Sequence, residues 1–95
     1  LTALAHSNSL GPTAVGSYAL TTMTNAPKNT AIGYKAGTAL TTGGSNTVSG
    51  YEAGDSATTA SGSVFVGADA GGGVTTGNQN TCIGSGTRIW RLYLH

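Results

Sequence analysis

The residues that could do chemistry are few, and the acidic ones form the first candidate group. Glu52 and Asp55 lie close together in one part of the chain, and Asp69 follows a short distance later. Carboxylates can bind a hard cation such as Ca²⁺, but calcium sites usually gather several of them within one loop. We therefore expect these residues to be solvated surface charges, and we predict neither a metal site nor a cofactor.

Catalysis requires a positioned base or nucleophile, and the sequence singles out none. The two histidines, His6 and His95, lie close to the two ends, and no spacing selects one of the many serines. Acyltransferase solenoids repeat every six residues and use a histidine within a coil, and neither feature is present. The glycines at 71–73 lack the lysine and the spacing of a phosphate-binding loop, so they predict a turn. The sequence therefore predicts a protein that is not an enzyme.

Composition narrows the class further. Charged residues make up 7% of the chain, with a net charge of +1, against about 25% in ordinary soluble domains. Nucleic-acid binding requires a clustered basic stripe, which is not seen. No stretch reaches about 18 consecutive apolar residues, so we expect no membrane insertion. Aromatic residues are scarce and 16 residues are glycine, so repetition and association with other chains must supply stability that a large core cannot.

A repeat of 17 residues organises the chain. Five glycines keep this step, each at the end of a string similar to Asn29-Thr-Ala-Ile-Gly; they are Gly16, Gly33, Gly50, Gly67 and Gly84. A fixed period over five units is typical of a solenoid, since one such unit cannot bury a core alone. Low charge with abundant glycine, serine and threonine is also typical of disorder, but the strict period favours an ordered stack.

Each unit is expected to form one coil of a parallel β-solenoid. Residues 29–36 alternate with a period of two, which predicts a strand. A second short strand is predicted around Leu40, before a turn at residues 43–45. The predicted fold is all-β, with five 17-residue coils over residues 11–87. Residues 1–10 are expected to form an irregular or partial coil, and residues 88–95 an apolar cap or a non-native tail.

Stacked coils turn the repeated positions into ladders. We predict a buried aliphatic ladder of Val15, Ile32, Val66 and Ile83, with Ser49 as its weak rung. Asn29, Asn46 and Asn80 suggest a ladder of amides at a corner, although turn propensity alone would also explain them. Cys82 shares its repeat position with Ala14, Ala31, Val48 and Phe65, so we predict a small buried side chain there.

The columns of small residues suggest how chains associate. The recurring glycine permits either a positive φ at a corner or the close approach of another backbone. Ala36, Ala53 and Ala70 follow the glycines three residues later. We expect these glycine and alanine columns to lie near an interface between parallel copies of the chain.

The string Asn29-Thr-Ala-Ile-Gly-Tyr-Lys-Ala-Gly, echoed at Asn46-Thr-Val-Ser-Gly-Tyr-Glu-Ala-Gly, resembles short repeats in the heads of trimeric autotransporter adhesins. It is also similar to repeats of trimeric bacteriophage tail fibres. The resemblance covers residues 11–87 and implies a left-handed parallel β-roll in which three chains pack side by side. The adhesin repeat is commonly shorter than 17 residues, so the resemblance also implies a longer outer loop over residues 38–45.

These observations together predict a non-enzymatic structural or adhesive segment of a homotrimeric fibre. Such a fibre would be extracellular, on a phage virion or a bacterial cell surface, and would contact a host surface, receptor or glycan. Contacts are expected at exposed loop positions that vary between repeats. The candidate contact residues are Lys35, Glu52, Asp55 and Asp69.

Two columns suggest alternative functions. Tyr34 and Tyr51 share one repeat position, where stacked rings could bind a sugar, but we expect them to pack within the rod or between chains. Threonine columns suggest ice binding, since a regular array of hydroxyls and methyls can order water. Paired threonines such as Thr41 and Thr42 would point to opposite faces of a strand, which weakens this second hypothesis. A purely structural spacer is the remaining alternative.

Overall fold

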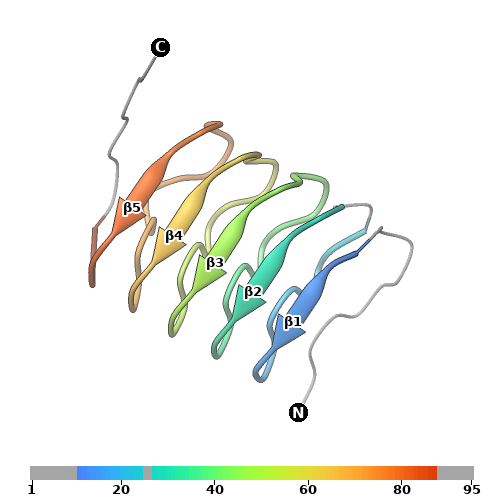
Figure 1. Ribbon diagram of the computed structural model, residues 1–95, viewed down its shortest axis with the longest axis horizontal. Helices are drawn as coiled ribbons and strands as arrows, with labels where there is room; N and C mark the ends of the chain where they lie inside the picture. The colour runs from blue at the N-terminus through green and yellow to red at the C-terminus, as the bar shows by residue number, and fades with distance from the viewer. Residues whose placement is uncertain (1–10, 25–26, 88–95) are drawn as a thin grey trace.

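Five short parallel strands, stacked in chain order, form one wall of the molecule. The computed structural model describes residues 11–24 and 27–87. The strands are β1 (Thr13–Val15), β2 (Thr30–Ile32), β3 (Thr47–Ser49), β4 (Val64–Val66) and β5 (Thr81–Ile83). They form a single sheet of order β1-β2-β3-β4-β5 (Figure 1).

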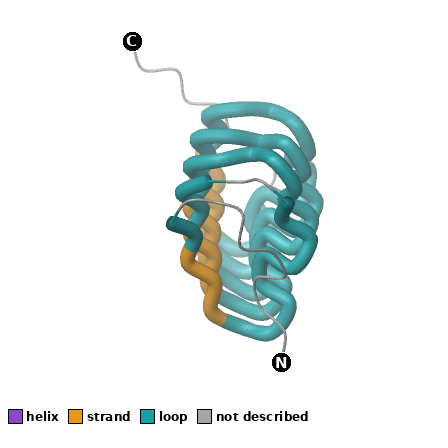
Figure 2. The backbone as a smooth tube through the Cα atoms, turned by 90° about the vertical axis from the view of Figure 1, so that its right-hand side faces the viewer, coloured by secondary structure: helices purple, strands orange, loops and turns teal. Residues whose placement is uncertain are grey.

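Each strand pairs with the equivalent strand of the next repeat. Thr13 pairs with Thr30 and Val15 with Ile32, and the same step continues through β5. Figure 2 shows the strands along one side of the coils and loops completing each turn. The predicted parallel β-solenoid with 17-residue coils is therefore confirmed. The segments predicted at residues 1–10 and 88–95 lie outside the described residues.

The rest of each coil is held by turns rather than by a second strand. Leu40 N–H donates to the Gly37 carbonyl at 3.0 Å, within its own coil, and Thr41 N–H donates to Thr58 of the next coil at 2.9 Å. Because the local turn uses backbone groups that a ladder would pair between coils, regular pairing does not develop. The prediction of a second strand around Leu40 is wrong. The described residues contain no helix that could span a membrane.

The core is a thin column inside the coils. The inward strand positions are Ala31, Val48, Phe65 and Cys82, all buried, with Ala14 partly buried below them. Phe65 is the largest of these side chains, and glycines make room for it: a Cβ on Gly71 would lie 2.4 Å from its ring. The prediction that Cys82 is a buried residue in this column is confirmed.

The aliphatic ladder forms in the predicted register but on the opposite side of the sheet. Ile32 pairs with Val15 below it, yet Ile32 is 45% exposed and Ile83 is 64% exposed. The prediction that this ladder is buried is wrong. Adjacent strand residues point to opposite faces, and the narrow interior takes the neighbouring column instead, which includes Ala31 and Cys82.

The columns of small residues serve contacts within the chain. Ala36, Ala53 and Ala70 are fully buried in their own coils, so the prediction that they lie at an interface between chains is wrong. Gly50 has φ +135, and a Cβ there would lie 2.6 Å from the Gly67 backbone. Both proposed reasons for the glycine column therefore apply, but the backbone that approaches belongs to the next coil of the same chain.

The asparagines form a buried axial ladder. The Asn29 side chain donates to the Gly43 carbonyl of its own coil at 2.7 Å and accepts from the Asn46 backbone N–H at 2.9 Å. Asn46 repeats both bonds, to Ala60 at 2.6 Å and from Ser63 at 2.9 Å. The ladder interpretation is confirmed, with the difference that each amide bonds to backbone rather than to the next amide.

Candidate interaction surface

The outward face of the sheet carries two rows of side chains that run across all five coils. One row consists of threonines, replaced in β4 by Val64; the other is aliphatic, replaced in β3 by Ser49. No strand residue is charged. Side chains repeat about 4.8 Å apart between coils and about 6.6 Å apart along each strand. The arrows in Figure 1 run nearly parallel, so the two rows form a regular array across the strands.

The threonine hydroxyls differ sharply between the two threonine columns. On the loop side, the Thr24 hydroxyl donates to the Thr41 carbonyl at 3.1 Å, and the Thr41 hydroxyl donates to Thr58 at 3.3 Å. Within the described residues, the strand threonines make no such side-chain bonds. These residues are Thr13, Thr30, Thr47 and Thr81. The hydroxyls of the strand column are therefore available to solvent, whereas those of the loop column form hydrogen bonds to the next coil.

A short row of tyrosines continues the exposed surface past the glycine corner. The rings of Tyr34 and Tyr51 stack with their centroids 5.3 Å apart, and Tyr18 meets Tyr34 edge-on at 6.1 Å. The Lys35 ammonium lies 5.4 Å from the Tyr34 ring centroid. The expected packing of Tyr34 against Tyr51 within the rod is confirmed. Because Tyr51 covers one face of Tyr34, that face is closed to a sugar ring.

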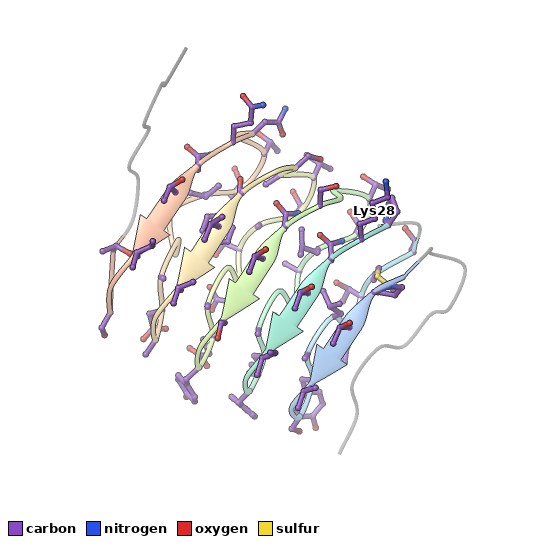
Figure 3. The ribbon with its side chains drawn as sticks, viewed as in Figure 1. Lys28 is labelled. Atoms are coloured by element: carbon purple, nitrogen blue, oxygen red, sulfur yellow. The ribbon has the colours of Figure 1, made fainter. Side chains whose placement is uncertain are left out.

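The predicted contact residues gather beside this tyrosine row. Lys35, Glu52 and Asp69 occupy one repeat position, all with positive φ between 54° and 61°. Asp69 is exposed as predicted, whereas Lys35, Glu52 and Asp55 are only partly exposed. Lys28 lies elsewhere, beyond the start of β2 (Figure 3). The fold therefore brings all four predicted residues to one corner, next to the sheet face.

The acidic residues come closer together than their sequence positions suggest. Carboxylate oxygens of Glu52, Asp55 and Asp69 lie within 4.8 Å of one another. The negative charge of Glu52 raises the pKa of the Tyr51 phenol above its usual 10.0, and desolvation and a hydrogen bond to Glu52 act in the same direction. Asp69 is exposed, and Glu52 and Asp55 are partly exposed, so the three carboxylates form a negatively charged group at the surface of the corner.

The two histidines considered for catalysis, His6 and His95, lie outside the described residues. No family model matches the chain, and comparison with curated proteins and with solved structures finds no match either. The sheet face and the adjoining corner are the candidate interaction surface of the described residues.

One feature of the corners escaped sequence reasoning. Besides the expected glycines, several non-glycine residues adopt left-handed conformations, including Tyr18, Lys35, Glu52 and Asp69 at the tyrosine corner. Such φ values normally favour glycine or asparagine. The sequence feature that indicates a left-handed conformation here is Gly86, which holds the same repeat position in the last described coil and has φ 73.

Proposed function

We propose that this chain is a non-enzymatic segment of a multi-chain fibre, of the bacteriophage tail-fibre or bacterial surface-adhesin kind, that works outside the cell. One observation carries the proposal: the exposed large apolar side chains of the described residues lie on one side of the rod. They are Val15, Ile32, Val66 and Ile83 on the sheet, and Tyr18, Tyr34 and Tyr51 at the adjoining corner. A contiguous apolar surface of this kind is typical of an association site.

A parallel copy of the same chain is the partner that this surface fits best. Two such rods share one axial repeat, so a neighbour in the same orientation meets every coil with equivalent contacts at once. The strands carry no charge, so close approach requires no burial of an unpaired ion. Three copies arranged about an axis would form a closed homotrimer.

Adhesion is proposed for the charged corner rather than for the sheet. Lys35, Glu52 and Asp69 vary in charge while they hold one repeat position, and a change there leaves the buried ladders intact. A trimer would present three such corners in parallel, so weak contacts with a host glycan or receptor would gain strength from multivalency.

Sedimentation of the wild-type chain and of Ile32→Asp tests the association. We expect the wild type to sediment as three chains of 9.3 kDa at micromolar concentration. Ile32→Asp should remain folded, because the side chain is exposed in one chain, but should sediment as a monomer. Thr42→Asp changes an exposed residue outside the strands and is the matched control. A folded wild-type monomer at all concentrations would rule out the fibre proposal.

Ice binding is the second candidate, and the strand threonines favour it. Their free hydroxyls alternate with methyl-bearing Val and Ile side chains in a rigid, periodic, uncharged array, which is the arrangement expected of a surface that orders water. Neighbouring threonines such as Thr41 and Thr42, which would point to opposite faces, belong to the loop column. Thr30 and Thr47 lie in the strands, so that objection to ice binding does not apply to them.

Thermal hysteresis separates the two functions. An ice-binding monomer should depress the freezing point below the melting point, and Thr47→Lys should abolish the effect while Thr59→Lys, at an exposed residue outside the strands, should not. Trimerisation without hysteresis would support the fibre, since the same face cannot be both buried between chains and open to ice.

A further inference from the structure

Within residues 11–24 and 27–87, the asparagine ladder ends on an acceptor that has no donor. Asn29 Oδ1 accepts from Asn46 N–H at 2.9 Å, Asn46 Oδ1 accepts from Ser63 N–H at 2.9 Å, and Ser63 Oγ accepts from Asn80 N–H at 3.1 Å. Asn80 is 2% exposed, and its Oδ1 has no hydrogen-bond partner. Buried polar atoms are nearly always paired, so this oxygen points to a missing backbone N–H at the next step of the stack.

The glycine column changes at the same edge of the described residues. A Cβ on Gly16, Gly33, Gly50 or Gly67 would meet the backbone of the following coil at between 2.6 and 2.7 Å. At Gly84, among the described residues, the nearest atom to such a Cβ would be Thr87 Cγ2 at 3.2 Å, and the backbone of no other described coil lies within 4 Å. The space above Gly84 therefore matches the space that a further glycine fills in every lower coil.

As far as the described residues show, the backbone of β5 has the other acceptors that a further strand would need. One coil lower, Val66 and Ala68 carbonyls accept from Gly84 and Gly86 N–H at 2.7 and 2.8 Å. Translated by one repeat, the equivalent acceptors are the carbonyls of Ile83 and Ser85. Together with Asn80 Oδ1, they form a row of acceptors along one edge of the sheet.

We propose that this edge of β5 binds an extended segment of the same repeat type, added in parallel as a further strand. The segment would place a backbone N–H on Asn80 Oδ1 and a glycine four residues later above Gly84, as in Asn29-Thr-Ala-Ile-Gly. Backbone bonds give such strand addition its affinity, and side-chain fit gives its specificity. The occupant is thus a strand with the Asn-Thr-x-x-Gly pattern.

The first coil of another copy does not meet this requirement. Its residue at the ladder position is Pro12, which has no backbone N–H to donate. End-to-end stacking of two copies would therefore leave Asn80 Oδ1 unpaired, which disfavours open-ended growth through this edge. Pro12 and Asn80 together select a strand with a non-proline residue at the ladder position.

Titration of the full chain with a synthetic peptide copying residues 28–45 tests the proposal. A matched peptide carries an ester oxygen in place of the N–H at the position of Asn29, so the two peptides differ in one donor. We expect the amide peptide to bind about tenfold more tightly to the wild-type chain, as one hydrogen bond to a buried acceptor allows. Against Asn80→Ala, the two peptides should bind almost equally.

Gly84→Ala provides a second variant if Asn80→Ala folds poorly. It should abolish binding of both peptides, because the new methyl group occupies the place of the incoming glycine backbone, while circular dichroism should show the coils retained. Two results would overturn the proposal: no binding of the amide peptide to the wild-type chain, as would follow if another part of the chain covers the edge, or an ester penalty that is unchanged by Asn80→Ala.

Discussion

Replacing Gly50 with alanine tests how closely the coils are stacked. Gly50 has φ +135, and the added Cβ would lie 2.6 Å from the carbonyl carbon and oxygen of Gly67, far inside the usual contact distance of about 3.5–4.0 Å. Strain at such a φ costs about 1–3 kcal/mol. The overlap adds to it, since a backbone atom cannot rotate away, so we expect Gly50→Ala to lose more than about 4 kcal/mol.

Gly84→Ala is the matched control for this prediction. Gly84 has a similar φ of +121, but within the described part of the chain its Cβ would meet a flexible methyl group, Thr87 Cγ2, at 3.2 Å, and no backbone atom. This variant should therefore lose only the backbone strain, about 1–3 kcal/mol. Urea unfolding followed by far-ultraviolet circular dichroism measures both losses. Equal losses in Gly50→Ala and Gly84→Ala would refute the claim that contact between coils, rather than φ alone, requires glycine.

Two further predictions concern side chains at the corners. Asn46→Ala should lower the free energy of unfolding by about 2–5 kcal/mol, because it leaves two buried backbone groups unpaired. Asn80→Ala should lower it distinctly less, because Asn80 Oδ1 has no partner among the described residues. A similar loss of stability in both variants, measured by urea unfolding, would contradict the ladder. The pKa of Tyr51 is raised above 10.0, so the stability linked to this phenol is present below its unfolded pKa and declines as pH rises through its folded pKa. Glu52→Gln should lower the pKa of Tyr51 in an ultraviolet titration. An unchanged titration would show that Glu52 is not the cause of the shift.

The sequence was sufficient to predict the stack but not which face of the sheet is buried. Equivalent residues 17 positions apart pair as expected, because a strict period leaves one register for parallel coils. Alternation alone could not choose between Ala31 and Ile32, since both columns are apolar, and the larger side chain was assigned to the core. Thr30 held the missing signal: it shares a face with Ile32, and a column of threonines is better placed in solvent than in a thin core.

For the predicted contact residues, the sequence indicates where they gather but not their backbone conformation. Lys35, Glu52 and Asp69 were chosen because they interrupt the repeated pattern, and their grouping at one corner follows from the 17-residue step. Their left-handed backbone conformations were harder to predict, because Gly86 is the residue at this repeat position whose type favours such a φ, while lysine, glutamate and aspartate do not indicate it. The free hydroxyls of the strand threonines likewise became apparent only once the outward face was known.

The central claim is that the exposed sheet face is covered by other copies of the chain, and methyl NMR with a soluble paramagnetic cosolute measures this directly. With isoleucine and threonine methyl groups labelled, we expect Ile32 and Ile83 to be strongly relaxed by the cosolute in dilute, dissociated protein and protected from it in the assembled protein. Thr42, which is exposed outside the strands, should be relaxed in both states. Ile32 and Ile83 methyl groups that remain as accessible as Thr42 in the assembled protein would contradict the account.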